Sequence, residues 1–341
     1  MTPEPTAPAS PPTSPPLAAP EPTPAQHRLA YARRMNRVLD HIDAHLDAPL
    51  ELAALAELAH FSPFHFHRLF AAWTGETLGA YLQRRRLEAA AQGLTLYPQR
   101  SVLQLALAVG FGSGEAFSRA FKLHFGCTPS AWRAGSAQRW AAYVEGLRRQ
   151  LGPRVLQERK PDQDGAAAAA DDEALSNTEP SRFIMHVEIK TLAPQRIAYM
   201  RHIGPYGPGI TEFWYQQVLP WLQAEGLDQR PTYGIGHDDP GITPAAHCRY
   251  DSAVGVDADF KTAHPAVSLA DLPGGLYAMA RFRGDGREIG TAWAELFREW
   301  LPASGYQCDG RPCFEFYDEP DGAQEPDTGL FRCWLCIPVR R

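Results

Sequence analysis

The chain has 341 residues, enough for two ordinary domains, each with its own hydrophobic core. Its hydrophobic content of 44% is typical of a globular protein, and no run reaches the ~18 apolar residues that a membrane span requires, which excludes a transmembrane helix. The net charge of −6 conceals a division, because residues 26–160 carry +8 and residues 161–341 carry −12. A basic segment beside an acidic one indicates that the first binds a polyanion and the second does not.

Low-complexity stretches interrupt the chain at 1–25, 161–181 and 319–328. The first is mostly Pro, Ala, Thr and Ser, without the basic and apolar regions of a signal peptide, so we expect a cytoplasmic protein with reduced cysteines. The composition predicts a disordered tail at 1–25, a helical domain at 26–152, a flexible linker at 153–182 and an α+β domain at 183–341. Such a linker gives no rigid connection between the domains.

The helical domain contains an internal repeat. At an offset of 50 to 51 residues the two copies match in Leu52/Val102, Leu55/Leu105, Ala59/Val109, Phe61/Phe111, Phe66/Phe117, Arg68/Arg119, Phe70/Phe121, Gly75/Gly126 and Tyr81/Trp132. Each copy is typical of a helix, a tight turn and a second helix. Ser62-Pro63 and Ser113 are placed to begin the second helices, and Gly110 lies at the second turn. The repeat therefore predicts an all-α double helix-turn-helix domain.

The second helix of each copy has an apolar face and a polar face. The apolar faces, which we expect in the core, contain Phe66, Leu69, Phe70 and Trp73 in one copy and Phe117, Ala120, Phe121 and His124 in the other. The polar faces carry an arginine at the same place, Arg68 and Arg119. A guanidinium fits guanine O6/N7 in the major groove, or a phosphate. One arginine on the polar face of one amphipathic helix is usually just solvated. Here the same position carries an arginine in both copies and the segment is positively charged, and these observations together indicate DNA binding.

The AraC family of transcription regulators has a signature that this domain resembles over residues 30–136, in Gly110-Phe111, Phe117-Ser118-Arg119, Phe121-Lys122, Gly126, Thr128-Pro129 and Trp132-Arg133. The resemblance implies two helix-turn-helix units, joined by a rigid helix at about Leu78–Leu94, that enter successive major grooves of double-stranded DNA. By position, the DNA-contacting residues are Phe64, His67, Arg68, Glu115, Ser118, Arg119 and Lys122. On the joining helix, Arg84, Arg85 and Arg86 either contact phosphate or form an exposed charge run.

The second domain contains a fainter repeat. At offsets of 79 to 81 residues the copies match in Trp214/Trp293, Val218/Phe297, Trp221/Trp300, Gly226/Gly305, Tyr233/Phe314 and Ile235/Phe316. Two strands, a helix and two strands, given twice, predict an α+β domain with a pseudo-two-fold repeat, an antiparallel sheet and a cleft between the halves. Clefts of this kind are common ligand sites.

The strand around Glu315 indicates how such a site would bind a ligand. Alternation places Phe314 and Phe316 on one face, which we expect beneath the helices, and puts Cys313, Glu315 and Tyr317 on the other, facing the cleft. A carboxylate among aromatic rings suits an organic cation.

The cation-binding prediction for Glu315 has a structural counterpart in the other repeat and a set of alternatives. Its pseudo-equivalent is Gly234, so one half offers a carboxylate where the other offers space. Alternatively, Glu315 pairs with Arg281 or Arg332, or lies in solvent.

Nearly all of residues 183–341 resembles the gyrase-inhibitory-protein-like (GyrI-like) effector-binding domain. The residues that carry the resemblance are Gly204-Pro205-Tyr206, Arg249-Tyr250-Asp251 and Phe314-Glu315-Phe316-Tyr317. The resemblance implies that Glu315 contacts amphipathic, often cationic ligands. The accompanying aromatic candidates are Tyr206, Trp214, Tyr250, Trp293 and Tyr317. Trp214 and Trp293 alternatively belong to the helix core. Since some members of this family are hydrolases, the alternative function is a hydrolase that uses Glu315, with the DNA-binding half regulating expression.

The remaining motifs point to no cofactor. Cys333 and Cys336 have the spacing of a zinc pair, but an odd separation on a strand turns them to opposite faces. No phosphate-binding loop, nucleophile elbow or dinucleotide fingerprint is present. The sequence therefore predicts a non-enzymatic transcription regulator without metal or cofactor. Its expected partners are double-stranded DNA, a small-molecule effector and RNA polymerase, and it is not expected to bind a membrane.

Overall fold

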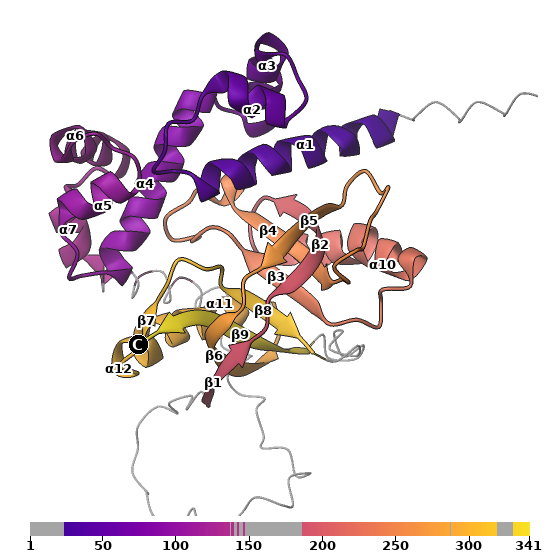
Figure 1. The fold of residues 1–341 in the computed structure, drawn as a ribbon. Coiled ribbons are helices and arrows are strands. Elements are labelled where there is room, and N and C mark those ends of the chain that lie inside the picture. The colour runs from indigo at the N-terminus through magenta and orange to yellow at the C-terminus, as the bar shows by residue number, and fades with distance from the viewer. Residues whose placement is uncertain are drawn as a thin grey trace, which may run out of the picture.

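The computed structural model of the chain describes residues 24–136, 138–139, 142, 146, 186–286, 288–318 and 330–341. Nearly all of the expected tail, the whole of the expected linker at 153–182 and the 319–328 loop lie outside these residues. Within them, no helix combines the length and the apolar character that crossing a membrane requires. The described residues form a helical half and an α+β half that are in contact with each other (Figure 1).

The helical half contains the two helix-turn-helix units that the repeat predicts. Its helices are α1 (Pro24–Ala44), α2 (Leu52–Leu58), α3 (Pro63–Thr74), α4 (Leu78–Leu96), α5 (Val102–Ala108), α6 (Gly114–Phe125) and α7 (Pro129–Ala134). The first unit is α2–α3 and the second is α5–α6. Helix α4 joins them, as the resemblance implies for about Leu78–Leu94, so the all-α prediction for this half is confirmed.

The two units use the same turn chemistry. Ser62 and Ser113 cap α3 and α6, each accepting a hydrogen bond from the backbone amide three residues on. The turn before each cap requires a positive φ, +83° at Gly110 and +56° at its counterpart His60. The close match of these local conformations shows that the repeat in sequence is also a repeat in structure.

Each unit has its own core. In the first, Phe66 and Phe70 are fully buried; in the second, Phe117 and Phe121 are. The expectation that His124 is a core residue was wrong, because its side chain is exposed and Phe125 packs inward instead. Phe125 continues the i, i+4 series from Phe117 and Phe121, and its ring lies 4.6 Å from that of Phe121.

The α+β half is built on one antiparallel sheet. Its strands are β1 (Val187–Leu192), β2 (Gln195–Ile203), β3 (Thr232–Gly236), β4 (Arg249–Gly255), β5 (Ser268–Leu272), β6 (Gly275–Gly284), β7 (Gln307–Cys308), β8 (Phe314–Tyr317) and β9 (Phe331–Arg340). The order is β1-β6-β9-β8-β3-β4-β2-β5, and the short β7 pairs with β9. Strands β3 and β8 come from different repeats and pair at the centre of the sheet. This confirms the predicted pseudo-symmetric α+β fold.

Two composite helices cover one face of this sheet, one from each repeat. The first runs through α9 (Pro208–Phe213), η1 (Trp214–Val218) and α10 (Leu219–Glu225), and the second through α11 (Ile289–Glu295), η3 (Leu296–Trp300) and α12 (Leu301–Ala303). Each contains a π-helical turn, η1 or η3, of the kind that is frequent at functional sites. A short 3-10 turn, η2 (Ala245–His247), precedes β4.

The expected facing of the β8 strand was wrong. Phe314 and Phe316 do not lie beneath the helices; they pack with Tyr233 and Tyr277 on the opposite face of the sheet. Glu315 therefore lies on the helix-covered face. Alternation was predicted correctly, but it does not say which face the helices cover, because the path of the connections between strands decides that.

Gly110 provides a test of the turn in the second unit. A Cβ atom there would lie 2.4 Å from the carbonyl oxygen of Leu46, and its φ of +83° disfavours any other residue. We expect Gly110→Ala to lower the free energy of unfolding by ~1–3 kcal/mol, measured by urea denaturation of the full chain. Gly112→Ala, where an added Cβ meets nothing within 4 Å, is the control and should change it by less than ~0.5 kcal/mol. Equal effects at the two positions would contradict the close approach.

Candidate functional site

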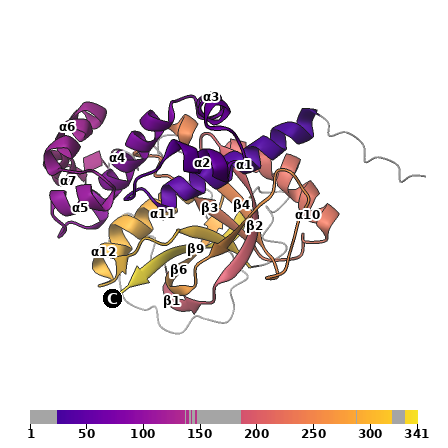
Figure 2. The same cartoon turned by 45° about the horizontal axis from the view of Figure 1, so that its top comes forward.

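The residues proposed to read DNA lie on the outer faces of α3 and α6. In both Figure 1 and Figure 2, these helices occupy the side of the helical half that faces away from the sheet. Phe64 is 70% exposed, and the guanidinium of Arg68 lies 6.0 Å from its ring centroid. His67, Glu115, Arg119 and Lys122 are exposed and Ser118 is half-buried. Contact with the α+β half therefore leaves both faces open.

Neither expectation for the arginine run on α4 is correct. Arg84 and Arg85 are 8% exposed, and all three side chains have partners within the protein. Arg84 binds Glu76 and Glu88, while Arg86 donates to the carbonyl oxygens that follow α1. These partners are set by the tertiary fold, so a run that looks solvated on a helical wheel is instead an internal set of ion pairs.

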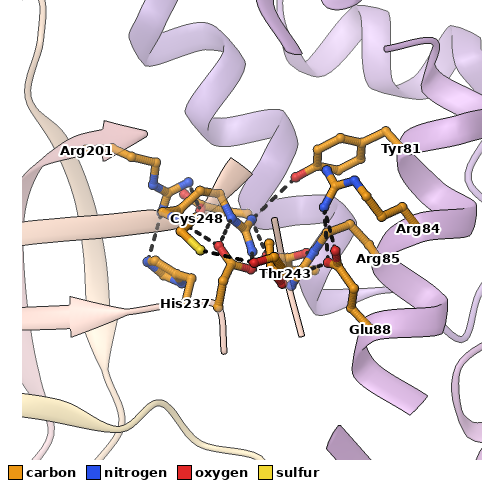
Figure 3. A network of polar contacts seen from close by, with 12 residues as sticks. Tyr81, Arg84, Arg85, Glu88, Arg201, His237, Thr243 and Cys248 are labelled. Carbon is orange, nitrogen blue, oxygen red and sulfur yellow. Dashed lines mark hydrogen bonds and ion pairs between the residues drawn. The ribbon is translucent and has the colours of Figure 1, made fainter. Parts of the chain in front are cut away.

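Arg85 belongs to a ring of four alternating charges that joins the two halves of the chain. Figure 3 shows the polar network around it, with Arg85 and Glu88 from the helical half and Arg201 and His237 from the α+β half. In this charge ring, Asp43 of α1 and Arg85 of α4 come from the helical half; Asp238 and Arg249 come from the α+β half. The Arg85–Asp43, Arg85–Asp238 and Arg249–Asp238 distances are 3.0, 2.6 and 2.8 Å, and an Arg249–Asp43 ion pair closes the ring. The described residues of the two halves are therefore in direct contact, which the prediction of a flexible linker did not include; the linker itself lies outside the described residues.

The electrostatics of the charge ring reflect its burial. Arg249 is 3% exposed and the side chain of Asp238 is 0% exposed. Burial by itself would raise the pKa of Asp43, but Arg249 and Arg85 outweigh this effect and hold that pKa well below its usual range. Asp43 is thus ionised wherever the two halves are in contact. The sequence carries one signal for this contact, the alternation of two charged residues with a tyrosine in Arg249-Tyr250-Asp251.

The six proposed ligand residues all line one hollow of about 2000 Å³. Its wall contains Tyr206, Trp214, Tyr250, Trp293, Glu315 and Tyr317. Part of the hollow lies over the centre of the sheet, between the two composite helices. The rest continues along the contact between the two halves, where Asp43, Arg85 and Asp238 also line it, and reaches Gln92 of α4 and Tyr97 directly after that helix. Trp214 and Trp293 are half-buried, each packing partly on the core of its own repeat and partly facing the hollow, so the core and wall alternatives both apply.

Glu315 lies at the wall of this hollow with no counter-ion among the described residues. It is 8% exposed and accepts hydrogen bonds from three neutral groups: the hydroxyls of Tyr250 (2.6 Å) and Tyr317 (3.0 Å), and the indole of Trp293 (3.3 Å). Burial raises the pKa of Glu315, and the three donors oppose the rise only in part.

Two of the alternatives for Glu315, an ion pair with Arg281 and exposure to solvent, are not found among the described residues. Arg281 forms its ion pair with Asp318, at 3.0 Å, and Glu315 is not in solvent.

The space expected at Gly234 is filled. Gly234 pairs directly with Glu315 across β3 and β8, but a Cβ atom on Gly234 would lie 1.8 Å from the hydroxyl oxygen of Tyr250. The glycine thus makes room for a phenol that hydrogen-bonds the carboxylate. Tyr206 packs beside it, with ring centroids 6.0 Å apart.

The cysteines are placed as the strand argument predicts. Cys333 packs under the helices, whereas Cys336 packs on the opposite face of the sheet. In the part of the chain that the structure describes, no cluster of three or more His, Cys, Asp or Glu residues is arranged to bind a metal ion, and the six cysteines are free thiols.

Comparison with known proteins agrees with this division of the chain. The profile of the GyrI-like small molecule binding domain matches residues 185–340, and a helix-turn-helix domain profile matches residues 55–135. The DNA gyrase inhibitor of Edwardsiella piscicida is 34% identical over 167 residues, which cover 46% of this chain and 99% of that protein. The right origin-binding protein of Escherichia coli is 28% identical over 300 residues, 86% of this chain and 93% of that protein.

Among solved structures, the chain is similar to an AraC-type transcriptional regulator from Chromobacterium violaceum. The sequence identity is 31% and the TM-score is 0.30, and the match covers 31% of this chain and 93% of that one. The two halves match separate family profiles, and the right origin-binding protein is similar to the chain across both. The chain belongs to the AraC-type DNA-binding regulators that carry a C-terminal GyrI-like small-molecule binding domain.

Proposed function

We propose that this regulator binds a lipophilic organic cation in the hollow of its α+β half, with Glu315 as the counter-ion. One observation carries the proposal: a buried carboxylate has only neutral partners among the described residues and borders a large aromatic-lined hollow. Burying a charge without a counter-ion is costly, and a bound cation would remove that cost. The indoles of Trp214 and Trp293 add faces that attract cations.

Binding, rather than hydrolysis, is the role that the neighbours of Glu315 support. Burial and the nearby carboxylate raise the pKa values of Tyr250 and Tyr317 well above the usual range, so neither phenol is a ready base or nucleophile at neutral pH. Their hydroxyls instead orient the carboxylate. We therefore propose a non-enzymatic effector site.

For the helical half, we propose that α3 and α6 read the major groove of duplex DNA. The proposed contacts are Phe64, His67, Arg68, Glu115, Ser118, Arg119 and Lys122. Support comes from the matched exposure of Arg68 and Arg119 on duplicated helices. The exposed ring of Phe64 suits a thymine methyl group. Contact with RNA polymerase by the DNA-bound regulator is part of the same proposal.

Arg119→Ala tests base reading by the second unit. Against duplexes selected from random sequence by the native protein, we expect a loss of ~1–3 kcal/mol that is concentrated at one base pair, because a bidentate contact to guanine is lost. Competition binding with single-base-pair variants measures it. Arg230→Ala removes the same charge from the α+β half and should leave the base preferences unchanged. A uniform loss across all sequences would assign Arg119 to phosphate.

Glu315→Gln tests the counter-ion. At pH 8, titration calorimetry with tetraphenylphosphonium should show binding weakened at least tenfold, about 1.4 kcal/mol, since the charge is lost while the shape is kept. Neutral triphenylphosphine oxide should lose less than about threefold. Glu212→Gln, on the exposed surface of α9, is the matched control. Equal losses for the cation and the neutral compound would show that Glu315 does not act through its charge.

The raised pKa of Glu315 predicts a pH-dependent stability difference. Because the folded chain holds this proton more tightly than the unfolded chain, the stabilisation is complete below the unfolded pKa and is lost as the pH rises through the folded one. Glu315→Gln stays neutral and its amide nitrogen can donate to both phenols. Without ligand, we expect its melting temperature to gain on that of the native protein between about pH 4 and pH 8. Parallel curves, as expected for Glu212→Gln, would refute this.

A further inference from the structure

Strand β4 has the charge ring on one face and Glu315, the carboxylate of the proposed effector site, on the other. Arg249 and Asp251 point toward the helical half, whereas Tyr250, between them, points to Glu315. This is the ordinary alternation of a β-strand. It places a ligand-site residue directly between two residues of the contact with the DNA-binding half.

Both charged residues of β4 are connected to α1, Arg249 directly and Asp251 through Arg201 of β2. Arg249 pairs with Asp43, while Asp251 binds Arg201 through two bonds of 2.6 and 2.7 Å. Arg201 in turn forms an ion pair of 2.7 Å with Asp40. The strand therefore holds α1 at two points almost one helical turn apart, Asp40 and Asp43.

A second connection runs through Tyr206. Its ring packs against Tyr250 in the hollow, and its hydroxyl donates to the backbone carbonyl of Arg249 (2.8 Å) and accepts from the backbone amide of Asp238 (3.2 Å). Arg249 and Asp238 are the two members of the charge ring that belong to the α+β half. Two tyrosines of the hollow are thus connected to the ring: Tyr250 is the chain neighbour of Arg249, and Tyr206 hydrogen-bonds the backbone of both Arg249 and Asp238.

The charge ring suits a contact that changes. Each half contributes one acid and one arginine that already pair with each other, Asp43 with Arg85 and Asp238 with Arg249. Within the ring, parting the halves would break two ion pairs and keep two, so each of the four charges would retain one partner. Outside the ring, Asp40 would lose Arg201, which would keep Asp251. Such a contact avoids the large penalty of a single buried charge and therefore responds to modest displacements.

We propose that β4 transmits the occupancy of the effector hollow to the DNA-binding half, through Tyr250 on one face and the charge ring on the other. The inference rests on the proposed effector site. A cation at Glu315 competes for the oxygen that accepts from Tyr250, and the phenol, which fills the space over Gly234, has to adjust.

The response reaches both helix-turn-helix units. Displacement of β4 shifts Arg249 relative to Asp43 on α1, which packs in the first unit, and Arg85 on α4, which joins that unit to the second. The outcome is a change in how α3 and α6 are presented to DNA.

A ligand-free mutant cycle on the full chain tests this connection. DNA affinity is measured by fluorescence anisotropy for the native protein, Tyr250→Phe, Asp43→Asn and the double variant. Because Tyr250 and Asp43 lie on opposite sides of the strand, independent effects would multiply. We expect the double variant to depart from that product by at least about threefold, with Tyr250→Phe losing its effect once Asp43 is replaced. Asp40→Asn serves as the interface variant should Asp43→Asn fail to fold.

The second arm adds tetraphenylphosphonium. The probe should change the DNA affinity of the native protein by at least about threefold, and should not change that of Asp43→Asn. Asp47→Asn, an exposed acid in the turn after α1, is the matched control and should respond like the native protein.

The outcomes separate the two proposals. Multiplicative effects in the mutant cycle, or an undiminished response to the probe in Asp43→Asn, overturn transmission through β4. If the probe does not bind the native protein but the cycle is non-multiplicative, β4 transmission stands and the cationic ligand is wrong. If the probe binds and the cycle is multiplicative, the effector site stands without this route.

Discussion

Four alternating charges hold the DNA-binding half against the ligand-binding half. Asp43, Arg249, Asp238 and Arg85 form a closed ring in which every charge has two opposite neighbours. The exposed recognition faces of α3 and α6 and the position of the hollow relative to α4 both depend on this contact. Since the ring is buried, its charges interact in a medium of lower dielectric than water and are little screened by salt.

Apolar contact complements the ring. Ile242, in the segment between β3 and β4, packs against the core of the second helix-turn-helix unit. The charge ring itself contacts α1 and α4, so the α+β half touches the first unit, the joining helix and the second unit together. A body that contacts all three is well placed to set the angle between two recognition helices, which must match the helical repeat of DNA.

Glu315 presents the opposite electrostatic situation. The ring satisfies every charge, whereas Glu315 is surrounded by two phenols and an indole that stabilise it only in part. Groups held at a cost to stability are commonly functional, because selection for folding alone would favour a neutral side chain. The two sites are separated by the thickness of one strand, and the contrast between them is the basis of the regulation we infer.

The sequence by itself determined the elements and their duplication. Helix caps at Ser62 and Ser113, the turn at Gly110 and the alternation around Glu315 depend on residues a few positions apart, so local pattern was enough to predict them. The presence of both domain types in one chain could likewise be predicted from motifs within each half.

Only the tertiary structure decided which surfaces meet. Arg85 binds Asp238, 153 residues away, and Arg249 binds Asp43, 206 residues away. No periodicity records such partners, and therefore the arginines of α4 looked solvated and the halves looked independent. The same limit applies to Glu315: alternation assigned its face relative to Phe314, but the folding of the helices over one side of the sheet decided that this face is the one lining the hollow.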